Sequence, residues 1–301
     1  MKALIDADIV VYEAGNAADH RYYTVDNIQF TTMKEARAHV LDTYKVVKKK
    51  DQNPFITFHR DPTPVQYSLS NCKELIGRIM ERTGSTKGQL YLTSDDKSNY
   101  RFGRATLRPY KGNRKPDTKP CRYHEMREYL VNSWGAEMIS GREADDALGC
   151  AQTENERVYH TMLLEGQQEG CYRTVLCSKD KDLKMIPGLR FDWQRDEMYE
   201  ITMEEADAWF YYQLIAGDST DHIQGVPGTG DVGATEALAG IDTNRGRYET
   251  AFELYRRACE KAGEDTAEDA VLSRLRENAD LLWIQREDGV MWEVPSEATV
   301  S

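Results

Sequence analysis

Short apolar runs alternate with amphipathic stretches through the first two thirds of the chain. The apolar runs predict buried strands over residues 3–11, 54–58, 89–93, 136–139 and 174–177. Apolar residues at helical spacing predict helices over residues 33–50, 74–83, 123–133 and 143–151. Strands that alternate with helices are typical of a mostly parallel sheet whose ligand chemistry lies at the carboxyl ends of its strands. We therefore expect an α/β fold with helices flanking a central sheet.

The last third of the chain has the pattern of a helical region. Helices are predicted over residues 204–216, 248–262 and 268–285, with another helix after the glycine-rich turn and a strand-like segment at 290–294. The polar residues 154–170 predict a variable excursion from the core. For 301 residues, we expect an α/β core over residues 1–200 and a helical region with a C-terminal cap over residues 201–301.

Acidic side chains recur in five short clusters, and four of these clusters follow an apolar run. Carboxylates at the ends of neighbouring strands converge on one pocket, where their mutual repulsion requires a cation. Oxygen ligands without thiolate or imidazole suit Mg²⁺ or Mn²⁺ rather than zinc. For a single acidic turn, the helix dipole alone explains the carboxylates without any metal. The clusters are Asp6 with Asp8, Asp95 with Asp96, Glu143 with Asp145 and Asp146, Asp180 with Asp182, and Asp218 with Asp221.

The charge of the chain is unevenly distributed. The net charge is -12, but residues 101–122 contain eight basic residues and one acid, a local charge of +7, so the remainder carries -19. An acidic body with one basic strip suits a protein that contacts phosphates along a single track and holds metal elsewhere. A solvated charged loop is the alternative explanation for such a strip. The strip is broken by glycine and proline, so we expect an irregular arch over about residues 97–127.

Two further features bear on the class of protein. Hydrophobic residues make up 40% of the chain, no apolar stretch reaches the roughly 20 residues that span a bilayer, and the N-terminus meets a charge too early for a signal peptide. We expect a cytoplasmic protein without a membrane partner. The glycine-rich turn at residues 225–230 between two predicted helices lets backbone N–H groups approach an anion, although such a turn alone is weak support for a phosphate site.

Six motifs, taken in order, resemble the 5′-nuclease superfamily over residues 5 to about 240. This superfamily includes the flap endonucleases, the 5′-nuclease domain of bacterial DNA polymerase I and the 5′ to 3′ exonucleases of bacteriophages, which this chain resembles most. The resemblance implies a PIN-like 5′-nuclease core, an arch over the site and a helix-hairpin-helix. The motifs are Ile5 to Asp8, the strand leading to Asp96, Leu107 to Arg114, Glu143 to Asp146, Ser178 to Asp182 and Gly217 to Gly230.

The resemblance also implies that the acids form two sets of metal ligands. Two Mg²⁺ or Mn²⁺ ions would activate water and stabilise the leaving 3′ oxygen of a phosphodiester. Asp8 and Asp95 are left open as contributors. Asp6 and Asp182 are taken as both metal-binding and catalytic. The implied ligands of the first ion are Asp6, Asp96, Glu143, Asp145 and Asp146, and those of the second are Asp180, Asp182, Asp218 and Asp221.

For the substrate, the resemblance implies DNA with a 5′ end or a 5′ flap, with RNA–DNA hybrids as an open addition. Lys111 and Arg114 would act as catalytic cations on the scissile phosphate, and the Tyr110 ring would stack on a displaced base. The remaining substrate-binding residues are Arg101, Arg108 and Lys115 in the arch, and Gly225, Val226, Gly228 and Gly230 in the helix-hairpin-helix, where a K⁺ ion is allowed for. We expect a monomer, in the host cytoplasm if phage-encoded.

Two other functions are compatible with part of the sequence. A haloacid-dehalogenase-like phosphohydrolase would use Asp6 as a covalent nucleophile in the pattern Asp6-x-Asp8, but it leaves the basic strip and the glycine-rich turn without a role. A non-catalytic nucleic-acid-binding relative would have lost some of the acids, and all of them are present. The sequence therefore favours a metal-dependent 5′ to 3′ DNA exonuclease with flap endonuclease activity that leaves 5′-phosphate products.

Overall fold

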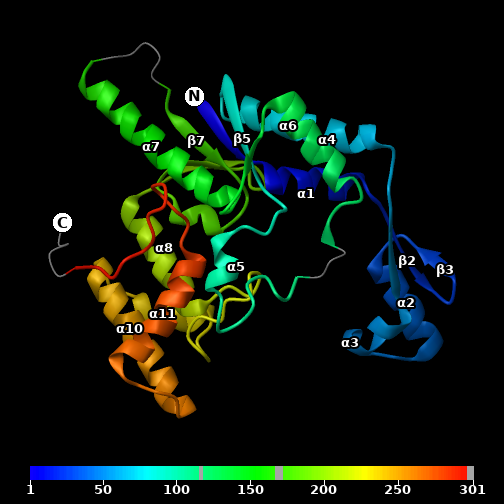
Figure 1. Ribbon diagram of the computed structural model, residues 1–301. Helices are drawn as coiled ribbons and strands as arrows, with labels where there is room; N and C mark the ends of the chain where they lie inside the picture. The colour runs from blue at the N-terminus through cyan, green and yellow to red at the C-terminus, as the bar shows by residue number, and fades with distance from the viewer. Residues whose placement is uncertain (115–117, 167–171, 297–301) are drawn as a thin grey trace. The chain divides into compact units, whose positions relative to one another are not determined.

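The computed structural model describes residues 1–114, 118–166 and 172–296 (Figure 1). The chain divides into two compact units. The first consists of Met1–Ile9, Arg78–Thr118 and Val131–Ser301, and the second of Val10–Gly77 and Lys119–Leu130. The domain boundary that we expected near residue 200 falls inside the first unit.

A six-stranded sheet forms the centre of the first unit. Its strand order is β6-β5-β1-β7-β8-β9, and every neighbouring pair is parallel except the antiparallel pair β8–β9. The predicted mostly parallel sheet is therefore confirmed. The strands are β1 (Lys2–Asp6), β5 (Lys87–Thr93), β6 (Glu137–Ile139), β7 (Thr174–Cys177), β8 (Gly188–Asp192) and β9 (Glu197–Ile201).

The order of the strands explains why acids far apart in the sequence meet. The three adjacent strands β5, β1 and β7 run parallel, so their carboxyl ends share one edge of the sheet. Asp6 is the last residue of β1, Asp95 and Asp96 follow β5, and Asp180 follows β7. The strands are held in place by burial, because β1 is inaccessible from Ala3 to Ile5.

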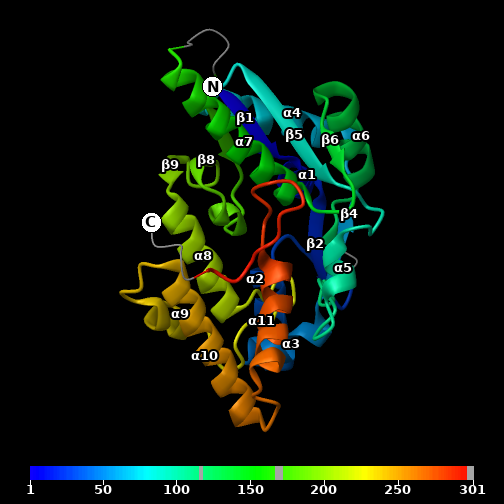
Figure 2. The same ribbon diagram turned by 60° about the vertical axis from the view of Figure 1, so that its left-hand side comes forward.

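Helices complete the chain and form most of its last third. Helix α7 packs against β1, β5 and β7, while α8 contacts α9, α10 and α11 (Figure 2). None of the helices in the described residues is long and apolar enough to cross a membrane. The helices are α1 (Ala7–Ala18), α2 (Met33–Tyr44), α3 (Lys49–Gln52), α4 (Val65–Arg82), α5 (Tyr100–Arg104), α6 (Tyr123–Trp134), α7 (Ala144–Leu164), α8 (Met203–Ala216), α9 (Asp231–Leu238), α10 (Asn244–Ala262) and α11 (Glu268–Leu282), with 3₁₀ turns η1 (Asn53–Phe55) and η3 (Asp182–Met185).

The second unit contains a small antiparallel sheet with its own core. The strands β2 (His20–Val25), β3 (Ile28–Phe30) and β4 (Thr57–Asp61) lie in the order β3-β2-β4. Val25 of the sheet packs with Ala36 and Val40 of α2, and all three side chains are buried. Helix α2 begins at a capping box in which Thr32 and Glu35 bond each other's backbone N–H groups.

Four sequence predictions are corrected by the structure. Residues 7–11 belong to helix α1 rather than to the first strand, because a buried apolar run does not distinguish strand from helix. The first part of 154–170 is helical, since α7 continues to Leu164. Residues 290–294 do not form a strand, and the predicted helix over 33–50 ends at Tyr44. Strands β2, β3, β8 and β9 were not predicted.

Candidate active site

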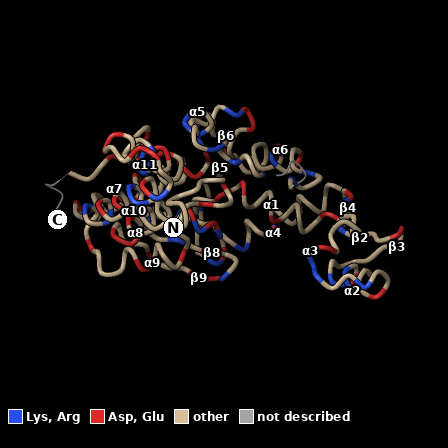
Figure 3. The backbone as a smooth tube through the Cα atoms, turned by 90° about the horizontal axis from the view of Figure 1, so that it is seen from below, with Lys and Arg blue, Asp and Glu red and all other residues tan. Residues whose placement is uncertain are grey.

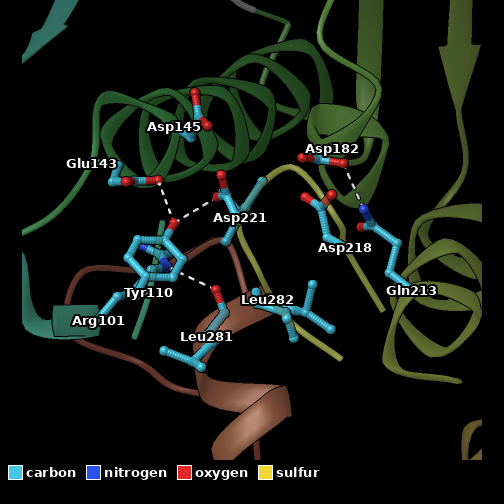
Figure 4. A pocket seen from close by; sticks show the side chains of 12 residues that line it. Arg101, Tyr110, Glu143, Asp145, Asp182, Gln213, Asp218, Asp221, Leu281 and Leu282 are labelled. Carbon is cyan, nitrogen blue, oxygen red and sulfur yellow. Dashed lines mark hydrogen bonds between the residues drawn. The ribbon is translucent and has the colours of Figure 1, made fainter. Parts of the chain in front are cut away.

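One pocket gathers five of the predicted acids at the carboxyl edge of the sheet (Figure 4). Glu143 and Asp145 come from the start of α7, Asp182 from the start of η3, and Asp218 and Asp221 from the loop after α8. The other lining residues are Arg101, Tyr110, Gln213, Ile223, Leu281, Leu282 and Ile284. The structure therefore brings together carboxylates that are up to 78 positions apart in the sequence, counted from Glu143 to Asp221 (221 - 143 = 78).

Asp6 is held behind this pocket at the end of β1. Its carboxylate is buried, accepts a hydrogen bond from the Ser178 hydroxyl at 2.8 Å and accepts another from the backbone N–H of Ile9 at 3.1 Å. Burial, followed by the nearby charges of Asp8 and Asp180, raises the pKa of Asp6 to about 7, although the two hydrogen bonds act in the opposite direction. Sequence reasoning missed Ser178, although its position just before the Asp180 cluster was a usable signal.

Asp145 is a further acid that lies beside other carboxylates. Burial, followed by the charges of Asp6 and Asp180, raises the pKa of this carboxyl well above its usual range. Asp145 lies in the first turn of α7, where exposed N–H groups favour a negative charge. An added cation at this position would offset the repulsion among the three carboxylates.

A second acidic pair lies on the opposite side of the pocket, formed by Asp182 and Asp218 (Figure 4). Burial, together with the charges of Asp180 and Asp218, raises the pKa of Asp182 to about 7. The Gln213 side-chain amide donates to Asp182 at 2.5 Å and fixes its orientation. Gln213 lies on α8 with no motif around it, so the sequence offered no signal for its role.

Basic and phenolic groups from the predicted arch meet the acids on the remaining side. The Tyr110 hydroxyl donates to Glu143 at 3.2 Å and to Asp221 at 2.8 Å. The Lys111 ammonium forms an ion pair with Glu143 and lies 3.6 Å from Asp221, and Arg114 lies 2.6 Å from Asp221. Although burial opposes ionisation, the charge of Lys111 lowers the pKa of Glu143 to about 2.

Arg101 and Asp146 form a buried pair beneath the pocket. The Arg101 guanidinium donates to both Asp146 oxygens and to the backbone carbonyls of Leu281 and Trp283, and it lies over the Tyr100 ring. The Asp146 carboxylate also accepts the backbone N–H groups of Glu143 and Gln285. With these partners both groups are already hydrogen-bonded, and the roles of Arg101 as a substrate contact and of Asp146 as a metal ligand stay predictions.

The Tyr110 ring is covered in this arrangement, so its predicted stacking role would require the ring to become exposed and stays a prediction. The side chain is 5% exposed, its hydroxyl is bonded to acids, and the edge of its ring meets Phe102 with 5.6 Å between ring centroids. A base has no access to such a ring. Phe102, on α5 within the basic strip, is 46% exposed and offers the open ring surface instead.

The acids after β5 do not line the pocket. Asp96 is exposed and accepts hydrogen bonds from the Ser98 backbone and hydroxyl, which lower its pKa to about 2. Asp95 is exposed as well. Asp8 accepts the backbone N–H of Thr93 at 2.9 Å, so it ties the start of α1 to the end of β5. The metal role of Asp96 remains a prediction.

The glycine-rich turn has the expected backbone but fewer free N–H groups than expected. Gly225 has a positive φ of 63° and lies so close to Gly217 that an added Cβ would come within 2.3 Å of the Gly217 nitrogen. Val226 is buried and its N–H donates to the Ile215 carbonyl, and the phosphate contact at Val226 stays a prediction. Gly228 and Gly230 are exposed before α9, where the helix dipole favours an anion. Arg108 is exposed too, and Lys115 lies outside the described residues.

The donor chemistry of the site fits a hard divalent cation. Asp6, Asp145 and Asp182 all have a raised pKa for the same causes, burial and neighbouring carboxylates, and a bound cation would relieve both. Within residues 1–114, 118–166 and 172–296, no group of three or more Asp, Glu, His or Cys side chains is already arranged to hold a metal ion. The acids therefore face a shared pocket without forming a closed ligand set.

Comparisons with known proteins agree with the resemblance in part of the chain. No protein-family model matches the chain. It is 34% identical over 123 residues to the exodeoxyribonuclease of Enterobacteria phage T3 and 32% identical over 123 residues to the exonuclease of Escherichia phage T7. Each match covers 40% of this chain and 38% of the relative. Among solved structures, the T5 5′-exonuclease with bound zinc has a TM-score of 0.51 and 14% identity, over 94% of this chain and 90% of that one.

These comparisons differ in what they establish. The chain has the fold of the T5 5′-exonuclease, and at 14% identity the fold is all that this likeness shows. The sequence matches to the phage T3 and T7 proteins confirm the resemblance to phage exonucleases over 123 residues of the chain. The matched segment spans less than two-fifths of the length of those relatives.

Proposed function

We propose that the protein is a divalent-metal-dependent 5′ to 3′ DNA exonuclease with flap endonuclease activity. It would hydrolyse phosphodiesters, leave 5′-phosphate products and act in phage DNA replication, recombination or primer removal. The observation that carries the proposal is the pocket that gathers five acids, two of which, Glu143 and Asp221, form ion pairs with the basic side chains of Lys111 and Arg114. Anionic ligands beside a cationic segment suit a reaction on a phosphodiester that also requires metal.

The residues sort into two sites for Mg²⁺ or Mn²⁺. Two such ions, when bound, supply an activated water and neutralise the charge of the phosphodiester. We assign Asp6, Glu143 and Asp145 to one ion, with Asp96 as a contributor through water, because Asp6 and Asp145 are electrostatically coupled. We assign the residues around Asp182 to the other ion. That second set comprises Asp180, Asp182, Asp218 and Asp221.

Lys111 and Arg114 have a role on the substrate side of this site. Their side chains are bound to Glu143 and Asp221 in the absence of substrate, which keeps two cations next to the acids. A scissile phosphate bound beside the two sets of metal-binding acids would offer its own oxygens to Lys111 and Arg114. These oxygens would replace the carboxylates of Glu143 and Asp221 as partners of the two cations. Fixed cations at developing negative charge typically contribute about 100- to 1,000-fold to turnover.

The turn before α9 supplies a second DNA contact. The exposed Gly228 and Gly230 precede α9, whose N-terminus carries a partial positive charge. We propose that this turn binds duplex phosphates away from the cut, with a K⁺ ion as an additional ligand. Duplex DNA with a 5′ end or a 5′ flap is the proposed substrate, and RNA–DNA hybrids are a second candidate.

The phosphohydrolase alternative has less support. A covalent nucleophile must reach the substrate, whereas Asp6 is 2% exposed and its two oxygens accept hydrogen bonds from Ile9 and Ser178. The raised pKa of about 7 would also leave much of this carboxyl protonated and a poor nucleophile at neutral pH. These observations favour Asp6 as an acid that is ionised only beside a bound cation.

The test is cleavage of 5′-labelled and 3′-labelled duplex and flap DNA with Mg²⁺ or with EDTA. We expect cleavage from the 5′ end with Mg²⁺, products with a 5′ phosphate, and no cleavage with EDTA. Asp182→Asn should remove activity, and Asp242→Asn, at an exposed acid between α9 and α10, is the matched control that should retain it. Cleavage that persists in EDTA, or release of p-nitrophenol from p-nitrophenyl phosphate with an aspartyl-phosphate intermediate, contradicts the proposal.

A further inference from the structure

The second unit contains a structured segment, residues 19–61, that contributes nothing to the active-site pocket. Its sheet and α2 share a buried core of Val25, Ala36 and Val40. All described residues that line the active-site pocket come from the first unit. A segment with its own core that takes no part in the pocket needs another explanation.

Apolar side chains stand exposed on one part of this segment. Tyr44 at the end of α2 and Phe55 in η1 are 39% and 38% exposed, and their ring centroids are 4.6 Å apart. The Tyr44 hydroxyl donates to Asp26 in the turn between β2 and β3, which fixes the ring in place. Leu41, one helical turn before Tyr44, is 43% exposed. These rings are therefore held rigidly in contact with solvent.

Lysines follow the exposed rings in the sequence. Residues 45–50 read Lys-Val-Val-Lys-Lys-Lys, without an acid among them, and all four lysines are exposed. Figure 3 shows this run as a basic stretch beside α3. Lys45 lies 3.5 Å from Asp42, whereas Lys48, Lys49 and Lys50 have no ion pair within the described part of the chain.

The charge of this segment also differs from that of the rest of the chain. Residues 19–61 contain eight basic and six acidic residues, a net charge of +2, so the other residues carry -14. Three of the six histidines lie in the same segment. An acidic protein that keeps a positive and aromatic segment apart from its basic strip has a further surface suited to an anionic partner.

Rigid rings beside lysines favour single-stranded nucleic acid over an acidic peptide. Unpaired bases stack on flat aromatic surfaces while lysines bind the phosphates, and neither contact requires a pocket. The apolar anchors of a peptide insert into a pocket, whereas the rings of Tyr44 and Phe55 are themselves 39% and 38% exposed. Paired bases are already stacked, so a duplex would leave the rings without a partner.

We propose that this surface, the lysine face, binds a single strand of the nucleic-acid substrate outside the active site. The lysine face consists of Leu41, Tyr44, Lys45, Val47, Lys48, Lys49, Lys50 and Phe55. The inference rests on the proposed function only in taking nucleic acid as the substrate. It adds a binding surface that the chemistry of the pocket does not require.

The test measures binding of a fluorescent oligothymidylate of about 30 nucleotides to the full-length protein in EDTA. Anisotropy is recorded between about 50 and 200 mM KCl for the parent, for K48Q/K49Q/K50Q and for F55A. The matched control is K73Q/K87Q/K261Q, which removes the same charge from three exposed lysines elsewhere. Thermal unfolding of each variant establishes that it is folded.

We expect the lysine-face variant to bind at least about 10-fold more weakly at low salt. Its plot of log affinity against log salt should be shallower by about 2, since each single-strand phosphate contact contributes about 0.7. F55A should weaken binding about 5-fold or more through lost stacking, with the salt slope unchanged. The control should retain the slope of the parent.

Two results would overturn the inference. One is a lysine-face variant that binds the oligonucleotide as tightly and with the same slope as the control. The other is unchanged oligonucleotide binding together with lost binding of a labelled Asp- and Phe-containing peptide, which would identify a peptide surface. Magnesium-dependent cleavage of a short blunt duplex is measured in parallel. If the parent does not cleave this duplex, the proposed function is contradicted. If the lysine-face variant still cleaves it, any change in oligonucleotide binding by that variant concerns the lysine face and not the active site.

Discussion

Arg101 and Asp146 form a bidentate ion pair in the interior of the first unit, with N–O distances of 2.7 and 2.9 Å and both side chains almost fully buried. The pair joins three elements. Arg101 begins the basic strip on α5, Asp146 lies in the first turn of α7, and the guanidinium also binds two carbonyls at the end of α11. It thereby fixes the turn that presents Glu143 and Asp145 to the pocket.

Arg101→Ala should therefore destabilise the protein strongly. Loss of one partner of a buried ion pair leaves the other charge uncompensated and costs about 3–5 kcal/mol. Urea unfolding followed by circular dichroism measures this change. Arg104→Ala is the control, because Arg104 pairs with Asp280 near the surface, where such pairs contribute about 0–1 kcal/mol. Equal effects of the two substitutions would contradict the structural role of Arg101.

The stability of the metal-free protein should depend on pH through Asp6 and Asp182. Both carboxyls have a folded pKa of about 7 against a reference value of 3.8, so between these values the folded state binds more protons than the unfolded state. The free energy of unfolding should consequently fall as the pH rises from about 4 to about 7. Chemical unfolding in EDTA across this range measures the slope.

Asp182→Asn should remove part of this pH dependence. An amide cannot ionise, so at pH 8 the metal-free variant should be more stable than the parent, by about 1 kcal/mol or more. Added Mg²⁺ should stabilise the parent and have less effect on the variant. If the variant is less stable than the parent at pH 8, the pKa of Asp182 is not raised in the folded state.

Lys111→Ala should separate metal binding from turnover. The Lys111 ammonium occupies a position beside Glu143 that a divalent cation would share, so its removal should leave Mn²⁺ affinity unchanged or raise it a few-fold. Cleavage should fall about 100- to 1,000-fold, because the cation facing the phosphate is lost. Mn²⁺ binding is measured by electron paramagnetic resonance, and turnover on flap DNA. Weaker metal binding in the variant would assign Lys111 a role in forming the metal site.

Gly149 tests the packing of the C-terminal segment on α7. A Cβ at this position would come within 2.3 Å of the Gln285 carbonyl oxygen, so Gly149→Ala must displace the segment after α11 and should cost about 1–3 kcal/mol. Gly77→Ala in α4 meets no atom within 4 Å and should stabilise the helix by about 0.5–1 kcal/mol. Thermal unfolding distinguishes these opposite signs.

The convergence of the acids was predictable from the sequence because it follows from strand order. Asp6 and Asp180 each end or follow a short apolar strand, and neighbouring parallel strands place such positions at one edge. The extent of β1 was not predictable, since Ala7 to Val11 is equally apolar as strand or helix. The turn at Asp26 and Asn27, which have φ values of 49° and 63°, was a usable hairpin signal that was missed.

Pairing between charged residues was the part that the sequence could not provide. Arg101 lies in a strip of eight basic residues and has the same local context as the exposed Arg108. Only the folded chain brings Asp146 and the carbonyls of α11 to its guanidinium. The contacts of Tyr110 were unpredictable for the same reason, because its partners Glu143 and Asp221 are 33 and 111 positions away.

The most direct measurement is cleavage of a 5′-flap DNA by Asp182→Asn and by the control Asp242→Asn, with Mn²⁺ binding recorded on the same samples. The account predicts that Asp182→Asn loses turnover by about 100-fold or more and binds fewer Mn²⁺ ions, while its affinity for DNA stays close to that of the parent. The control should match the parent in all three properties. Cleavage by Asp182→Asn at the parent rate, with unchanged Mn²⁺ binding, would contradict the assignment of the pocket acids to a metal-dependent reaction.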